Sequence, residues 1–91
     1  MFGYPLVVVG WSDHQSNGGP GWETIESQLE WANEAPPIVY TVGWIIFENE
    51  MQIVLVDTLL DDTETGSAHK ILKKNVVMRK ELYYGQETVT A

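Results

Sequence analysis

Two apolar runs separated by a short polar break constrain the fold of this chain most. The first run, from Ile38 to Phe47, is rich in Val, Ile, Tyr, Trp and Phe, which fit the pleated surface of a strand. The second run, from Met51 to Leu60, alternates in its first half, and the polar residues 48–50 separate the two. This pattern predicts a β-hairpin. Because both runs carry apolar residues on both faces, we expect the hairpin to lie centrally in the sheet.

The remaining chain predicts three further strands, a loop and an acidic turn. The strands are expected at Tyr4–Trp11, Ala68–Leu72 and Val76–Leu82. Residues 12–21 are rich in Ser, Asn, Gly and Pro and predict a loop. Residues 61–67 predict an acidic turn, and residues 85–91 predict a frayed tail.

One helix is expected over about residues 22–35. Its apolar side chains recur at helical spacing and form one stripe: Trp22, Ile25, Leu29 and Ala32. The pair Pro36-Pro37 ends the helix. Trp31 falls on the opposite, polar side, where it either contacts a partner or lies against a loop.

Five short strands and one helix indicate a mainly β fold. A chain of 91 residues forms one domain with a small core, and such chains often close their sheet or oligomerise. We therefore expect a single domain over residues 1–91, built as a small, strongly bent five-stranded barrel, because closure removes unpaired edges. Gly43 marks a position where the strand bends or another backbone approaches closely.

The charged residues divide the chain into an acidic body and one basic strip. The net charge is −8, which disfavours a general nucleic-acid binder. All five basic residues lie between Lys70 and Lys80. This strip is either a solvated face, a local anion site or the basic half of a self-complementary interface.

Several classes of protein are disfavoured by what the sequence lacks. Without cysteine there is no disulfide or cysteine-based zinc site, which fits a reducing compartment such as the cytoplasm. No apolar segment reaches the roughly 18 residues of a membrane span. The adjacent residues Ser12, Asp13 and His14 cannot form a catalytic triad within one loop. We expect no enzymatic activity, no cofactor and no metal.

The hairpin resembles the first motif of the Sm/LSm family, the ring-forming RNA-associated proteins that include bacterial Hfq. Residues from Gly43 to Asp57 follow the spacing of that motif, with Phe47, Met51 and Leu55 at its apolar positions. Residues 72–77 lie where the second motif is expected. The resemblance covers about residues 38–82 and extends to small Sm-like proteins of marine bacteriophages of the cyanophage type.

The resemblance implies an Sm-like barrel that assembles into a homo-oligomeric ring and binds single-stranded RNA. The RNA-pocket positions of the family correspond to Glu48 and Gln52, and its Arg-Gly pair corresponds to Lys73-Lys74. Together with Asn75, the lysines would surround the ring opening, in the cytoplasm of a host cell if the chain is of phage origin. The alternative is an SH3-like barrel that serves as a phage structural or protein-interaction module without nucleic-acid binding.

Overall fold

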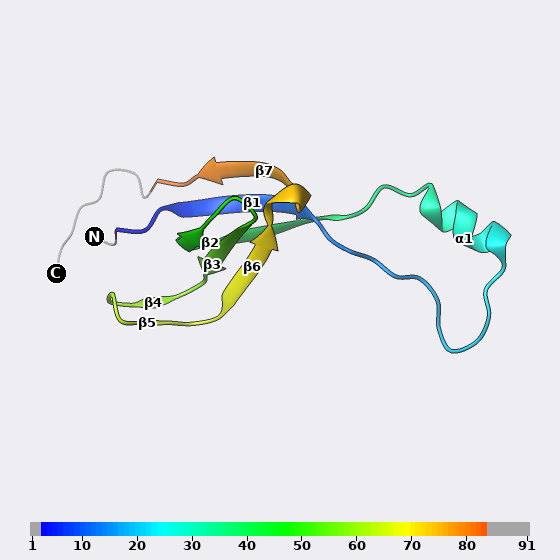
Figure 1. Ribbon diagram of the computed structural model, residues 1–91, viewed down its shortest axis with the longest axis horizontal. Coiled ribbons are helices and arrows are strands. Elements are labelled where there is room, and N and C mark those ends of the chain that lie inside the picture. The colour runs from blue at the N-terminus through cyan, green and yellow to red at the C-terminus, as the bar shows by residue number, and fades with distance from the viewer. Residues whose placement is uncertain (1–2, 84–91) are drawn as a thin grey trace.

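Five antiparallel strands form the body of the molecule in the computed structural model, which describes residues 3–83. They are β1 (Leu6–Ser12), β2 (Ile38–Glu48), β3 (Gln52–Val56), β6 (Ala68–Leu72) and β7 (Val76–Glu81). Their order in the sheet is β6-β3-β2-β1-β7, as Figure 1 shows. The five predicted strands are thus confirmed, with shifts of a few residues at their ends.

The β2–β3 hairpin is formed by the polar break that the sequence places between the two apolar runs. The side-chain oxygen of Asn49 accepts hydrogen bonds from the backbone N–H groups of Met51 and Gln52, both at 2.9 Å. A short Asn side chain commonly stabilises a turn in this way. β2 lies at the centre of the sheet, as expected for a strand with apolar residues on both faces.

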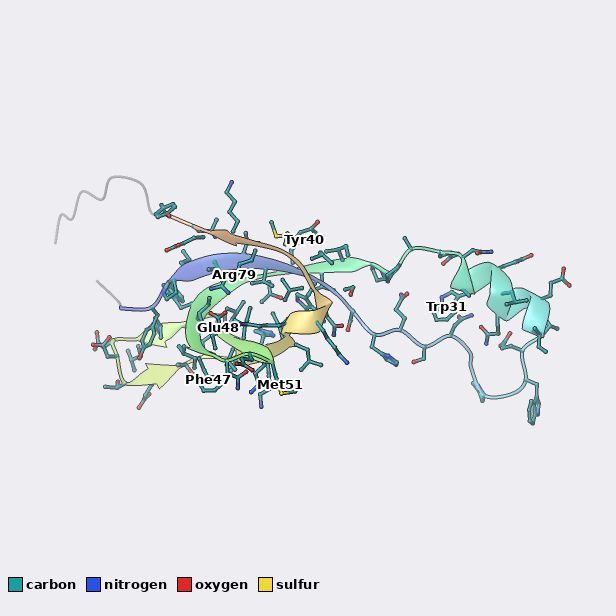
Figure 2. All side chains as sticks on the ribbon, turned by 45° about the horizontal axis from the view of Figure 1, so that its top comes forward. Trp31, Tyr40, Phe47, Glu48, Met51 and Arg79 are labelled. Carbon is teal, nitrogen blue, oxygen red and sulfur yellow. The ribbon has the colours of Figure 1, made fainter. Side chains whose placement is uncertain are left out.

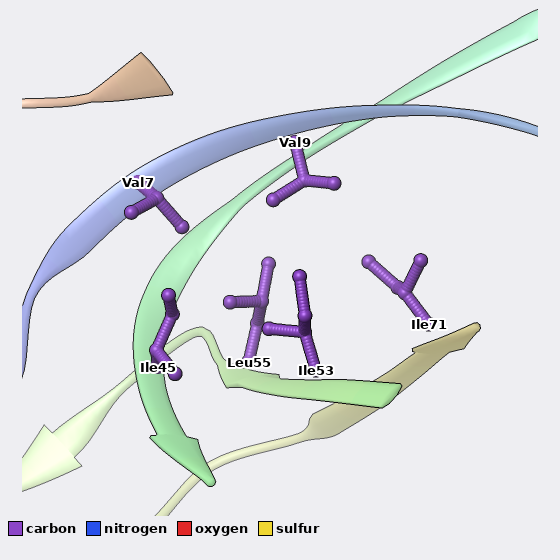
Figure 3. Close-up of a cluster of buried hydrophobic side chains, with 6 residues drawn as sticks. All are labelled: Val7, Val9, Ile45, Ile53, Leu55 and Ile71. Atoms are coloured by element: carbon purple, nitrogen blue, oxygen red, sulfur yellow. The ribbon is translucent and has the colours of Figure 1, made fainter. Parts of the chain in front are cut away.

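One face of the sheet carries the hydrophobic core. Six buried side chains from β1, β2, β3 and β6 converge there (Figure 3): Val7, Val9, Ile45, Ile53, Leu55 and Ile71. Because side chains alternate along a strand, the positions between them lie on the opposite face, which we call the outer face. The sheet curves around the core, and a register shift between Ile45 and Phe47 marks an irregularity near the end of β2.

The sheet is not closed into a barrel, so the predicted closure is corrected. Within residues 3–83, β6 and β7 are the two edge strands and each has one neighbour. The 3-10 turn η1 (Lys73–Asn75) joins them and redirects the chain, so that β7 pairs with β1 and not with β6. The structure supports a bent five-stranded sheet, and the finer SH3-like or Sm-like assignment stays a prediction.

Gly43 allows the backbones of β2 and β3 to approach each other closely. A Cβ atom at this position would lie 2.6 Å from the carbonyl oxygen of Val56 and 3.2 Å from the Cβ atom of Leu55. Real Cβ atoms do not come so close to a backbone oxygen, and only glycine fits here. The expectation of a close backbone approach at Gly43 is confirmed.

The expected helix is present but shorter than predicted. α1 spans Ile25–Ala32, and the Thr24 side chain caps it by accepting a hydrogen bond from the Ser27 N–H at 3.1 Å. Thr24 itself is extended, so the helix cannot begin earlier. A residue that precedes proline avoids helical backbone angles. Pro36-Pro37 therefore prevents the helix from continuing to this point, and an irregular stretch separates the two.

Residues 13–37 form an arm that projects from the end of β1 and β2. Figure 1 shows α1 at its tip, away from the sheet, and the whole molecule measures 61 × 28 × 24 Å. Gly18 and Gly21 adopt positive φ angles of 137° and 126° in the loop that leads to the helix, where other residues would be strained. None of the residues in α1 is buried.

A small second hairpin extends the chain between β3 and β6. It consists of β4 (Leu59–Leu60) and β5 (Glu64–Thr65), joined through the predicted acidic turn. The predicted second strand of the central hairpin is therefore divided into β3 and β4. The predicted tail over residues 85–91 lies outside the described residues.

Candidate functional site

Three charged side chains from separate elements meet inside the bend of the sheet. Glu48, at the end of β2, accepts two hydrogen bonds from the Arg79 guanidinium of β7, at 2.8 and 3.1 Å. The ammonium group of Lys73, in η1, lies 2.7 Å from the same carboxylate. Figure 2 shows Glu48 and Arg79 directed toward each other. We call these three residues the Glu48 cluster.

The Glu48 cluster joins strands that are not neighbours in the sheet. β2 and β7 are separated by β1, yet the curvature brings the end of β2 beneath β7. Arg79 is opposite Val9 in the β1–β7 register, so it projects from the inner face of β7. A carboxylate that accepts hydrogen bonds from two nitrogens of one guanidinium is held in a fixed geometry. The cluster therefore links the two sides of the open sheet.

The two cations hold the pKa of Glu48 well below its usual value. Hydrogen bonding from Arg79, and then from Lys73, lowers this pKa from 4.5 to about 2, because both contacts favour the charged carboxylate. The same contact raises the pKa of Arg79. Glu48 is thus an ionised acceptor that is already engaged by two cations of the protein.

The five predicted RNA-binding residues lie at one end of the sheet but do not act as one set. Glu48 and Lys73 are engaged with each other. Gln52 is half-buried at the start of β3, opposite Leu72. Asn75 is half-buried, and its backbone carbonyl accepts a hydrogen bond of 3.5 Å from the Ser12 hydroxyl.

Lys74 is the exposed cation among the predicted residues, and two pockets adjoin it. One pocket of about 270 Å³ is lined by Glu50, Met51, Leu72 and Lys74. The other, of about 340 Å³, is lined by Ser12, Asp13, His14, Leu72, Lys74 and Asn75. Each pocket also contains an acidic residue, which opposes the binding of a phosphate.

The remaining basic residues are spread over the sheet. Within residues 3–83, Lys70, Lys74 and Lys80 make no ion pair, whereas Lys73 and Arg79 both contact Glu48. Lys70 is on the edge strand β6, and Lys80 is on the opposite edge strand β7. The basic strip of the sequence is therefore divided in space, and two of its five cations share one carboxylate.

The apolar stripe of α1 faces solvent. Ile25 and Leu29 of α1 are 78% and 62% exposed, and Trp22, which precedes the helix, is 100% exposed. Beside this stripe, the Gln28 side chain forms two 3.0 Å hydrogen bonds with Asn17 of the arm. Trp31 is half-buried beside a pocket of about 220 Å³ that Asp13 and Gln15 also line (Figure 2). Of the two interpretations of Trp31, the structure supports a position against the loop.

A second apolar surface lies on the outer face of the sheet. Tyr40 and Val42 of β2 are 64% and 53% exposed, and Met78 of β7 is also exposed. Gly10 lies between Tyr40 and Met78 in the register. A Cβ atom there would lie 2.7 Å from the Cγ atom of Met78 and 3.0 Å from the Tyr40 ring. Both side chains therefore lean over Gly10 and form a continuous surface.

Sequence reasoning identified the stripe on α1 but not its exposure, and it did not identify the surface on the outer face. Helical periodicity located the stripe on α1 but gave no information about what covers it. The alternation of β2 carries a signal for the outer face, since Tyr40 and Val42 share one side of the strand. The partner strand β7 comes from a distant part of the chain, so the surface itself exists only in the folded molecule.

Comparisons of this chain with protein-family models, with curated proteins and with solved structures found no match. Across residues 3–83, no group of His, Cys, Asp or Glu side chains is arranged to hold a metal ion. The same residues contain no helix that is long and apolar enough to cross a membrane. The function must therefore be argued from the surfaces described above.

Proposed function

We propose that this protein is a protein-interaction module of a larger assembly, in which the arm is the contacting element. The observation that carries the proposal is the orientation of α1. Gln28 is hydrogen-bonded to Asn17 of the same arm, and the neighbouring apolar side chains of Ile25 and Leu29 stay exposed. Apolar side chains in such a position stabilise the protein only when a partner covers them and removes their surface from water.

The charges of the molecule support protein contact over nucleic-acid contact. The net charge is −8, and two of the five basic side chains form ion pairs with the Glu48 carboxylate. Nucleic-acid affinity depends on several cations that neutralise phosphates together. Within residues 3–83 the three unpaired lysines are separated on different elements, so they offer no continuous track for a phosphate chain.

A photo-crosslinking side chain in place of Leu29 tests the proposal. The position is exposed, so the replacement leaves the core unchanged. We expect crosslinked protein products in the cells that produce the chain, identified by mass spectrometry. The same group in place of Met51, which is also exposed and lies on the β2–β3 turn, is the matched control. Equal crosslinking at both positions, or none at position 29, would refute an interaction role for the arm.

A second candidate function, the binding of single-stranded RNA by a homo-oligomeric ring, is favoured by one observation. Gln52, Lys74 and Asn75 lie around the same end of the sheet, beside the two pockets that share Lys74. In a ring formed through the edge strands β6 and β7, copies of this end would surround one opening. Several weak cation sites would then act on one RNA chain.

Fluorescence anisotropy of labelled U-rich and A-rich RNA separates the two functions. RNA binding through this end predicts an affinity that falls steeply with salt and is lost in Lys74→Glu. Lys74 is the appropriate residue because a change at Lys73 would also disturb Glu48. Lys70→Glu, on the adjoining strand β6 but outside both pockets, is the control. We expect no binding at low salt, and salt-dependent binding that only the Lys74 variant loses would favour the RNA function.

A further inference from the structure

We propose that α1 of one copy docks on the outer face of the sheet in a second copy of this chain, and that two copies exchange their arms reciprocally. The inference rests on the proposed function and names the partner of the arm. It joins the two exposed apolar surfaces of the molecule, the stripe on α1 and the outer face formed by Tyr40, Val42, Met78 and Lys80.

The arm presents its apolar stripe in a fixed orientation. The bonds between Gln28 and Asn17 tie α1 to its own arm beside the stripe, and Ile25 and Leu29 remain exposed together. A pocket of about 430 Å³ runs along this part of the helix, with Ile25 and Leu29 among its lining residues. The pair is one helical turn apart, the spacing at which an amphipathic helix contacts an apolar surface.

The outer face offers a matching apolar surface. Tyr40 and Met78 cover Gly10 from the two sides of β1, and Val42 lies in the next row of the same face. That row continues across Val8 to Lys80 of β7. The surface is thus apolar at its centre and positively charged at its edge, as protein interfaces commonly are.

The two surfaces carry opposite charges. The arm has five carboxylates and neither Lys nor Arg: Asp13, Glu23, Glu26, Glu30 and Glu34. Glu26 and Glu30 are one helical turn apart and flank Ile25 and Leu29. Lys80 on the outer face makes no ion pair within residues 3–83. Docking would place the acidic flank of α1 near this lysine, which favours a defined orientation.

The connection between α1 and β2 directs the arm toward another molecule. Pro36 and Pro37 have restricted φ angles and favour an extended chain, and they immediately precede β2. The arm therefore continues beyond the sheet and does not fold back on it, as Figure 1 shows. Each copy has one arm and one outer face, so a two-fold exchange satisfies both surfaces and leaves none open.

Light scattering of the full chain across the micromolar range tests the inference. For the unchanged chain we expect the mass of a dimer. For Ile25→Ser/Leu29→Ser we expect an affinity of dimerisation that is at least about tenfold weaker. Met51→Ser removes an equally exposed apolar side chain from the distant β2–β3 turn and should leave the affinity unchanged. A monomeric mass throughout the range, or an equal loss of affinity in the Met51 variant, would overturn the inference.

Charge reversal provides an independent test of the docking orientation. We expect Glu26→Lys/Glu30→Lys and Lys80→Glu each to dimerise weakly on their own. An equimolar mixture of the two should form a heterodimer, because its two contacts are native arm on native face and reversed arm on reversed face. Failure of the mixture to recover dimer would refute the pairing of α1 with the outer face.

The crosslinking experiment distinguishes failure of this inference from failure of the proposed function. A product between position 29 of one copy and the outer face of a differently tagged copy supports the exchange. A product with a different protein and no dimer refutes the exchange and leaves the interaction role of the arm intact, whereas a product only within one chain refutes both. The absence of any product refutes both.

Discussion

Replacing Glu48 with Gln removes the carboxylate that links β2, η1 and β7, and it should destabilise the fold by about 1–1.5 kcal/mol. Lowering a carboxyl pKa from 4.5 to about 2 corresponds to about 3.4 kcal/mol at 1.36 kcal/mol per pKa unit. The side chains of Glu48 and Arg79 are 31% and 40% exposed, so solvent screening reduces that value. The bidentate geometry and the second cation keep it at or slightly above the range of a single surface ion pair.

The pH dependence of this effect has a definite sign. The folded-state pKa of Glu48 is lower than its value in the unfolded chain, so the cluster stabilises the fold fully above about pH 4.5. The contribution is lost progressively as the pH falls from about 4.5 through about 2, and only below both pKa values is the carboxyl group protonated in both states. The difference between the two proteins should also decrease in high salt.

Thermal unfolding of the unchanged protein and of Glu48→Gln at pH 7 and near pH 2 measures this contribution. At neutral pH we expect the melting temperature to fall by about 4–8 °C for each kcal/mol lost. Glu50→Gln is the matched control, because Glu50 makes no ion pair within residues 3–83. A difference between the proteins that persists unchanged near pH 2, or an equal effect of the Glu50 variant, would refute the electrostatic link.

Two further predictions concern positions where the backbone determines the outcome. Gly43→Ala should lower the free energy of unfolding in urea by about 2 kcal/mol or more, since its Cβ would meet a Val56 carbonyl oxygen. Gly10→Ala should lower it less, because the flexible Met78 side chain can move. Similar losses in the two variants would contradict this explanation. Thr24→Ala should reduce the helical circular dichroism signal without changing the unfolding midpoint of the sheet, because α1 is capped by Thr24 and contributes no buried residue; a lowered midpoint would show that arm and sheet unfold together.

The sequence determined the local elements of this protein. Alternating and apolar runs located the five main strands, Asn49 and its acidic neighbours gave the central turn, and the proline pair ended the helix. These features depend on neighbouring residues, whose spacing and conformational preferences are present in the chain itself. Gly43 was likewise identified, because a glycine within an apolar strand signals close approach of another backbone.

Tertiary structure decided the position of the charges and of the apolar surfaces. The basic strip is continuous in sequence, yet strand alternation turns Arg79 inward to Glu48 and leaves Lys80 on the outer face. The apolar stripe of α1 is visible in the sequence, but its exposure follows from the extended arm that carries it away from the sheet. Contacts between residues about 30 positions apart depend on the curvature of the whole sheet, which no local pattern specifies.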